Sequence, residues 1–531
     1  MRLTATLAFL AFLGSSCGGS SGRTIVLVTV ESLRADAARP PALEKLAGSG
    51  RTFSDAVAAS PMARPSVVSI LTGAAPDRSA VRDSLFDRIP DEIPTVVERL
   101  KAVGWATGGF VGSASCARGS GLERGFDLYD APKIENLGPG RLLPQARPAA
   151  DVAANAATWL AGLDPEADAF VWVHLADLTA LPFGLDDMST SSAAYATAVA
   201  GLDAPLSVVL DAAAKRPGAE VLVAGTHGIY LGEDAKFGDS FWIDGTTLHV
   251  PLIWSGGRAA KGSDARPTWL PDVGATIATS GGVTLGSSSE GMDLATAADA
   301  ASRTRPSWSW APDDQEGWPT LASLPQRPAT PRPRALSAAA RAKVEAAGVH
   351  LGTTPKTWPE RPKGSEEVVQ RVGRARFLLS KGRTGPAGVT ARQGLITFPD
   401  DLGLLSIHLY LAWQGAGRDP VKDTVEKLST LYPDRQDALH WLAHFESGAK
   451  RAESAEALSR AALEVGPRDP DLLYDLACSR SLAGDIPGGM AFLDEAVKAG
   501  FQEWDWMDKD TDLSAVRADP KYAELRRTAG R

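Results

Sequence analysis

Uninterrupted apolar runs alternate with amphipathic segments along the first three hundred residues. The runs within 24–30, 169–174 and 220–228 lack the polar alternation of half-exposed strands. Such runs are typical of strands that are buried on both faces of a parallel sheet. Segments with the apolar spacing of helices lie at 41–48, 93–104, 149–163 and 193–214. The alternation predicts an α/β doubly wound sheet over residues 23–302, with helices on both faces.

A different period governs the last third of the chain. Pro399, Pro433 and Pro467 are 34 residues apart (433−399 and 467−433), and Leu405, Leu439 and Leu473 share this spacing. Thirty-four residues is the period of tetratricopeptide (TPR) repeats, which are pairs of helices. We therefore predict an all-α TPR solenoid over residues 366–528 with a capping helix near 520–527. Its groove is expected to take a protein or peptide partner.

Between these two regions the chain is rich in proline and arginine. Residues 303–365 are predicted to form a semi-rigid linker. Within it, residues 336–350 are predicted to form a short helix.

Two histidines lie one helical turn apart in the repeat region, His440 and His444. The glutamate that a zinc protease needs after the first histidine is missing. The repeat register predicts that both side chains face the groove, where they contact solvent or a partner.

The N-terminus has the pattern of an export signal. Arg2 precedes an apolar segment at 3–13, and small residues follow up to Cys17. This segment is too short to span a membrane. The sequence around Cys17 resembles a bacterial lipoprotein signal, which implies lipidation of Cys17, a tether up to residue 22 and anchoring to a membrane. The prediction is an outer-membrane lipoprotein of the bacterial cell envelope, and the alternative is plain secretion.

Length, charge and cysteine content limit the number of domains, the class of partner and the disulfides that are expected. A chain of 531 residues is expected to hold more than one domain. The net charge of −9 argues against a nucleic-acid partner, which would favour a basic face. Cys116 and Cys478 fall in different predicted domains, so we expect two buried thiols and no disulfide between them.

The first apolar run leads into two segments with recognisable residues. It is followed at once by Glu31 and Ser32 and then by Leu-Arg-Ala-Asp at 33–36; later come Pro65-Ser66 and Leu-Thr-Gly at 71–73. This arrangement resembles the start of a sulfatase-type domain of the alkaline phosphatase superfamily. In that family a Cys, Ser or Thr nucleophile stands two residues before Pro-Ser. Here that position is Ala63.

The resemblance also implies where a metal and a substrate would bind. The family-aligned metal positions are Glu31, Ser32, Thr226 and His227, where Thr226 replaces an aspartate. His174 and Asp177 align with positions that bind the ligand. The family's downstream histidine positions hold Thr179, Asp234, Asp239 and Phe241. We therefore expect a divalent cation, Ca²⁺ or similar, to be bound weakly or not at all.

Ala63 raises the question of whether the domain is an enzyme, because a methyl group has no lone pair to attack sulfur or phosphorus. The favoured hypothesis is a pseudoenzyme with a degenerate site that binds or scaffolds other molecules. The rival is an active metal-dependent hydrolase of sulfuric or phosphoric esters that uses a variant site, with Ser60, Ser66 or Ser69 as a relocated nucleophile. A third possibility is an inactive domain that still binds anions. Glu31 and His227 are equally well explained as a buried hydrogen-bonded pair.

Overall fold

The structure is a computed structural model. It describes residues 22–82, 84, 87–132, 146–179, 188–233, 237–239, 243–296, 305, 307, 336–352, 368, 371–372, 374–375, 378, 384–416, 422–466, 469–499, 501 and 503–529. The predicted export signal with Cys17, most of the predicted linker, Asp234 and Phe241 lie outside these residues.

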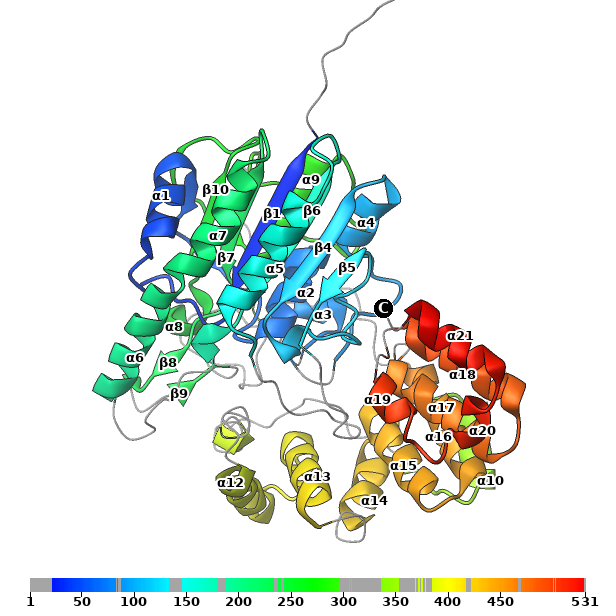
Figure 1. The fold of residues 1–531 in the computed structure, drawn as a ribbon. Helices are drawn as coiled ribbons and strands as arrows, with labels where there is room; N and C mark the ends of the chain where they lie inside the picture. Colours follow the sequence, from blue (N-terminus) through cyan, green and yellow to red (C-terminus); the bar gives the residue numbers. More distant parts are fainter. Residues whose placement is uncertain are drawn as a thin grey trace, which may run out of the picture.

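An eight-stranded mixed sheet forms the centre of the first domain (Figure 1). In sheet order its strands are β11 (Gly262–Asp264), β2 (Arg51–Phe53), β10 (Leu252–Ser255), β7 (Glu220–Gly225), β1 (Thr24–Val30), β6 (Ala169–Leu175), β4 (Ala106–Val111) and β5 (Leu128–Asp130). The run from β7 to β5 is parallel, and β10 is antiparallel to both of its neighbours. Two small two-stranded sheets pair β3 (Ala56–Val57) with β12 (Thr268–Trp269) and β8 (Tyr230–Leu231) with β9 (Phe237–Gly238).

Helices cover both faces of this sheet. The helices of the first domain are α1 (Pro41–Ser49), α2 (Ala63–Thr72), α3 (Pro76–Ser79), α4 (Val96–Ala102), η1 (Ala114–Cys116), α5 (Ala149–Ala161), η2 (Asp177–Thr179), α6 (Met188–Gly201), α7 (Asp203–Ala214), α8 (Gly245–Leu248) and α9 (Pro271–Gly281). Alternate residues of β1 enter two separate cores. Ile25 and Leu27 pack with α2, α4 and α9, whereas Val26 and Val28 pack with α1, α5 and α7. The predicted helices on both faces of an α/β sheet are thus present.

The segment predicted as one helix at 193–214 forms two, α6 and α7, which meet at Leu202. By length and composition, the span Ser191–Ala214 could also cross a membrane. In this fold, however, Val199, Leu206 and Val209 are buried in the core with β1 and β6. Packing within the domain therefore accounts for these three side chains of the span.

The C-terminal part of the chain is helical, and we call residues 336–529 the helical domain. Its helices are α10 (Ala338–Ala346), α12 (Thr384–Thr397), α13 (Leu402–Ala416), α14 (Lys422–Leu431), α15 (Gln436–Gly448), α16 (Ala452–Val465), α17 (Pro470–Leu482), α18 (Ile486–Lys498), α19 (Trp504–Met507), α20 (Ser514–Arg517) and α21 (Pro520–Ala529). The starts of α13, α15 and α17 are 34 residues apart (436−402 and 470−436), and so are those of α16 and α18 (486−452). The short helix predicted at 336–350 is α10, which packs against α16.

The helical domain lies beside the end of the sheet at which the parallel strands finish (Figure 1). Met62, immediately before α2, is buried in one apolar cluster with Val372, Ile407 and Tyr410 of the helical domain. Arg88 forms an ion pair of 2.5 Å with Asp469, just before α17. These contacts attach the helices to the edge where an α/β sheet usually carries its site.

Candidate functional site

Two neighbouring parallel strands bring the four family-aligned metal positions together at the carboxyl end of the sheet. Glu31 and Ser32 follow β1, while Thr226 and His227 follow β7. The Thr226 amide donates to the carbonyl of Val30 at 2.9 Å, so the chain continues the pairing of β1 with β7 into the site. The sequence therefore places these four residues together because their strands are adjacent and end at the same level.

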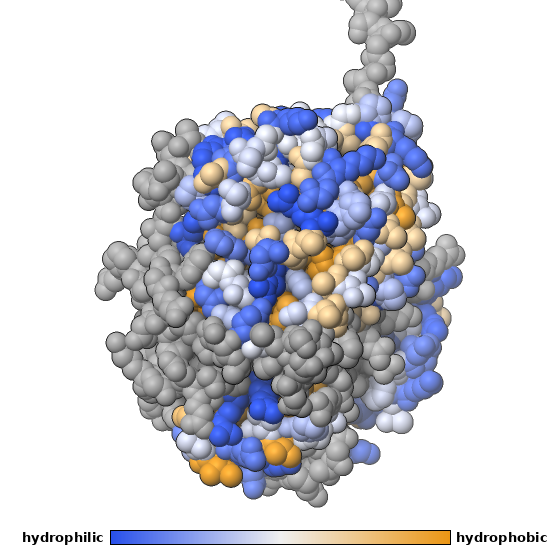
Figure 2. All heavy atoms as spheres, turned by 90° about the vertical axis from the view of Figure 1, so that its left-hand side faces the viewer, coloured by the Kyte–Doolittle hydropathy of each residue, from blue (hydrophilic) through white to orange (hydrophobic). Residues whose placement is uncertain are grey.

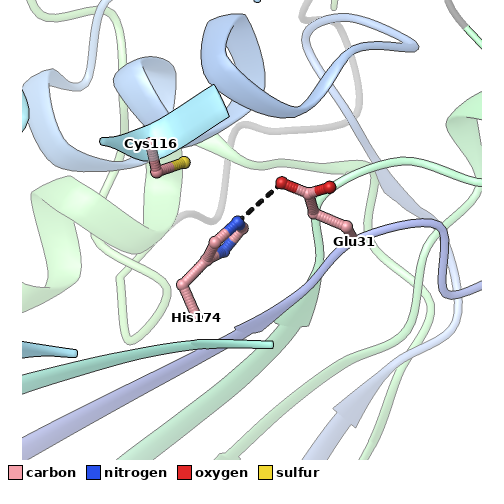
Figure 3. Close-up of side chains that lie close together, drawn as sticks. All are labelled: Glu31, Cys116 and His174. Carbon is pink, nitrogen blue, oxygen red and sulfur yellow. Dashed lines mark hydrogen bonds and ion pairs between the residues drawn. The ribbon is translucent and has the colours of Figure 1, made fainter. Parts of the chain in front are cut away.

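His174 is delivered to Glu31 from the other side of β1. In β6 it pairs with Thr29, and its Nε2 lies 2.8 Å from Glu31 Oε1 (Figure 3). Both side chains are almost completely buried, with 0% of His174 and 5% of Glu31 exposed. Thr29 Oγ1 lies 2.7 Å from His174 Nδ1 and accepts a hydrogen bond of 2.9 Å from Trp172 Nε1. These contacts fix the orientation of the imidazole.

The electrostatics of this pair favour two opposite charges. Burial opposes ionisation of Glu31, but the hydrogen bond and positive charge of His174 hold the pKa of the carboxyl below its usual range. Burial likewise opposes protonation of His174, but Cys116 and Glu31 raise the pKa of the imidazole to about 10. The hydrogen bond and the directions of these two shifts favour a carboxylate at Glu31 beside an imidazolium at His174.

A third group, the thiol of Cys116, completes this cluster (Figure 3). One ligand atom from each of Glu31, Cys116 and His174 lies within 4.8 Å of the others. Ser115 donates a hydrogen bond of 2.8 Å to Glu31 Oε1, and its own hydroxyl lies 2.8 Å from that of Ser113. As predicted, Cys116 and Cys478 are free and buried.

Cys116 was predicted to be a buried thiol and not part of the site, because a buried cysteine alone usually acts as a small apolar side chain. Its position after a predicted strand is the feature of the sequence that could have indicated a place in the site. Ser113, Ser115 and Cys116 follow the carboxyl end of β4, next to β6 in the sheet, where side chains converge with those that follow β1.

The family-aligned positions are a poor match for a hard cation. Glu31 is the single carboxylate among them, and it is already paired with His174. The hydroxyls of Ser32 and Thr226 are buried without a hydrogen-bond partner among the described residues, and they offer neutral oxygen. Ca²⁺ and Mg²⁺ prefer several oxygen ligands that include carboxylates. The Glu–Cys–His cluster instead has the nitrogen and sulfur donors of a borderline transition-metal site.

His227 and Asp177 make contacts of their own. His227 Nδ1 lies 2.8 Å from the carbonyl oxygen of Gly228 and 3.9 Å from a carboxylate oxygen of Asp239. Asp177, in η2, accepts a hydrogen bond of 3.1 Å from the amide of Ala149 at the start of α5. Its carboxyl therefore caps a helix, and burial raises its pKa.

The first turn of α2 carries the position that corresponds to the family nucleophile. Ala63 is its first residue, and its methyl group is buried. Next to it, buried Arg64 donates from Nε to the carbonyl of Ser115 at 2.6 Å and from Nη1 to the carbonyl of Asp87 at 2.7 Å. The guanidinium thus ties α2 to η1, the turn that also carries Cys116.

Two of the three candidate serines already donate their hydroxyl hydrogen. Ser66 donates to the carbonyl of Ser60 at 2.7 Å, and Ser69 donates to the carbonyl of Pro65 at 2.9 Å. Ser66 thus ties the loop before α2 to the helix. The Ser60 hydroxyl is buried without a hydrogen-bond partner among the described residues, so none of their basic groups is placed to take its proton.

Comparison with known proteins bears on the fold. The sulfatase family matches residues 23–283. Similar solved structures include a 2-O GAG sulfatase, with 14% identity over 54% of this chain and 75% of that chain and a TM-score of 0.43. Another is the phosphonate monoester hydrolase of Agrobacterium radiobacter, with 14% identity over 56% of this chain and 78% of that chain and a TM-score of 0.41.

A search of curated proteins found no match. The family match covers the mixed sheet, the helices on both faces and all family-aligned site positions. Residues 23–283 of this chain form a sulfatase-family domain.

Proposed function

We propose that the sulfatase-family domain of this chain does not hydrolyse esters and instead serves as a platform for the helical domain. The helical domain would act as a TPR-type binding module for a protein or peptide. The whole protein would be exported and held on the outer membrane through lipidated Cys17, as a surface-anchored scaffold.

The observation that carries this proposal is the methyl group of Ala63 at the start of α2. A side chain without a lone pair cannot form the covalent intermediate of a nucleophilic mechanism. The nearby hydroxyls of Ser66 and Ser69 donate to backbone carbonyls, which leaves them poorly placed to act in its stead.

Electrostatics around the Glu31–His174 pair support the same conclusion. Cleavage of a sulfate or phosphate ester requires positive charge that stabilises the oxygens of the transition state. The imidazolium of His174 is held by Glu31 in a buried pair, so its charge is already compensated. Arg64, the adjacent cation on α2, donates to two backbone carbonyls.

Packing against the helical domain supports a platform role. Met62, next to Ala63, is buried among Val372, Ile407 and Tyr410. The surface beside the nucleophile position is thus occupied by the protein's own helices. An apolar side chain in this position favours stable docking of a domain over repeated entry and release of a charged ester.

The 34-residue spacing between the starts of alternate helices supports the TPR assignment. Small residues such as Ala443 and Ala477 recur at this spacing and are buried. In such an array each helix pair packs on its neighbours and leaves a continuous face for a partner.

An assay on the full chain tests the proposal. Purified protein is supplied in turn with Ca²⁺, Mg²⁺, Mn²⁺ and Zn²⁺, and release of nitrophenol is followed from aryl sulfate, aryl phosphate and aryl phosphonate esters. We expect no release above that of Glu31→Gln or of buffer. Turnover by the wild-type chain that is lost in Glu31→Gln would overturn the proposal in favour of the hydrolase.

The anchoring part of the proposal has its own test. Expression in a bacterial host with a labelled fatty acid is expected to label the wild-type chain in the membrane fraction. Cys17→Ser should remove the label. A wild-type chain that is exported but carries no label would favour plain secretion.

A further inference from the structure

We propose that Glu31, Cys116 and His174 bind one divalent ion of the zinc class. This site shares Glu31 with the family-aligned metal positions, but its other two ligands, Cys116 and His174, add sulfur and nitrogen donors from outside them. All three protein ligands are buried, and a water would complete the four-coordinate shell of the ion. The ion would tie together β1, β6 and η1 at the carboxyl edge of the sheet.

The chemistry of the donors identifies the class of ion. Thiolate, imidazole and carboxylate are the three ligand types that zinc takes in proteins. A thiolate and a carboxylate would together balance the two positive charges of the ion, which a buried site requires. Ca²⁺ and Mg²⁺ would be disfavoured, because they prefer oxygen ligands throughout.

The spacing of the donors is compatible with such an ion. Tetrahedral zinc with bonds of about 2.0–2.3 Å separates its ligand atoms by about 3.3–3.6 Å. His174 Nε2 and Glu31 Oε1 are 2.8 Å apart, and all three ligand atoms lie within 4.8 Å of one another. The ion would take the place of the hydrogen between His174 and Glu31. To make room for it, His174 Nε2 and Glu31 Oε1 would move apart by less than 1 Å from their present distance of 2.8 Å.

Surrounding groups already hold the ligands in the way that metal sites require. A metal-bound histidine normally has a partner for its second ring nitrogen. Here Thr29 Oγ1 lies 2.7 Å from His174 Nδ1 and is itself held by Trp172. Ser115 donates to the oxygen of Glu31 that faces His174. These contacts leave the imidazole Nε2 directed at the cluster (Figure 3).

Metal binding by the full chain tests the site directly. The chain carries Cys17→Ser so that Cys116 and Cys478 are its remaining thiols. This chain is unfolded in the presence of a chelator and is then refolded with Zn²⁺, Co²⁺ or Ca²⁺. The metal bound per chain is measured after gel filtration. We expect one Zn²⁺ or Co²⁺ per chain and no Ca²⁺. The cobalt form should show a thiolate-to-cobalt charge-transfer band in the near ultraviolet.

Matched variants assign the ligands. Cys116→Ser should abolish the charge-transfer band and weaken zinc binding at least about 100-fold, more than the loss of an outer contact does. Thr29→Val, which removes an outer contact, should weaken binding about 10- to 100-fold. The controls are Cys478→Ser and His440→Gln, which change the same residue types in the helical domain and should leave the band and the affinity unchanged. Far-ultraviolet circular dichroism shows whether each variant has refolded.

Failure to retain Zn²⁺, a preference for Ca²⁺, or a charge-transfer band that persists in Cys116→Ser would overturn the proposal. Should Cys116→Ser fail to refold, Cys116→Ala, which keeps a small apolar side chain in this buried position, replaces it and should likewise lack the band. Ester turnover by the zinc-loaded chain would contradict the proposed function and leave this site standing. Absence of zinc binding would remove the site and leave the proposed function standing.

Discussion

At the scale of single residues, the chemistry of the candidate site depends on the buried carboxylate of Glu31 and the imidazolium of His174 beside it. His174→Gln leaves Glu31 with a charge that no cation balances. Removal of one partner from a buried ion pair costs about 3–5 kcal/mol. We therefore expect His174→Gln to lower the free energy of unfolding by about that amount, measured by urea denaturation of the metal-free chain.

A double variant controls for the volume of the lost ring. Glu31→Gln together with His174→Gln removes both charges and leaves two amides that can hydrogen-bond with each other. It should recover most of the lost stability, because an uncharged pair has no charge to desolvate. Equal stability of the wild type and His174→Gln would contradict the ionised pair that the geometry implies.

At the scale of secondary structure elements, α2 depends on the helical domain through Met62. Met62→Ala removes most of a side chain that is fully enclosed, and such changes cost about 2–5 kcal/mol. We expect a lower urea midpoint and faster proteolytic cleavage between the sulfatase-family domain and the helical domain. Val103→Ala, at a largely exposed position, is the control and should change stability by less than about 0.5 kcal/mol. Unchanged proteolysis in Met62→Ala would show that this contact does not hold the helices in place.

A second prediction at this scale concerns the contact between α15 and α17. His440, predicted to face the groove, is instead buried, and its Nε2 lies 3.1 Å from Asp475. Burial lowers the pKa of His440, but Asp475, Asp469 and Asp471 outweigh this and raise it above its usual 6.5. The stabilisation by the charged histidine is therefore complete below pH 6.5 and is lost as the pH rises through the raised pKa.

The corresponding measurement is the melting temperature as a function of pH. Wild-type protein should lose more stability between pH 6 and pH 9 than His440→Gln does, because the variant has no proton to release at this position. Parallel pH profiles for the two proteins would contradict the charged pair.

At the scale of the whole molecule, the ion pair between Arg88 and Asp469 connects the two domains. The side chains of Arg88 and Asp469 are 15% and 9% exposed, so each charge depends on the other. We expect Arg88→Ala and Asp469→Ala each to destabilise the docked arrangement, and the double variant to cost clearly less than their sum. A double-mutant cycle on unfolding free energies measures this coupling. Strict additivity would indicate that the pair contributes nothing to docking.

The sequence specified the architecture better than the site. Apolar runs such as 24–30 must be buried on both faces, so the sheet and its strand ends followed from pattern alone. The pairing of Glu31 with His174 did not follow, because it depends on β6 lying beside β1 rather than on any local signal. Cys116 was missed for the same reason, since its turn is brought to the cluster by β4. The burial of Met62 by the helical domain depends on how the two domains pack. Neither the apolar runs of the first domain nor the 34-residue period of the second contains that information.

Whether any residue of this domain becomes covalently modified is the most direct test of the account. The full chain is incubated with an excess of aryl sulfate or aryl phosphate, quenched with acid and examined by intact-mass and peptide mass spectrometry. Our expectation is no burst of phenol and no added sulfo or phospho group, because Ala63 offers no attacking atom. One equivalent of phenol with a matching adduct on Ser60, Ser66 or Ser69 would contradict it.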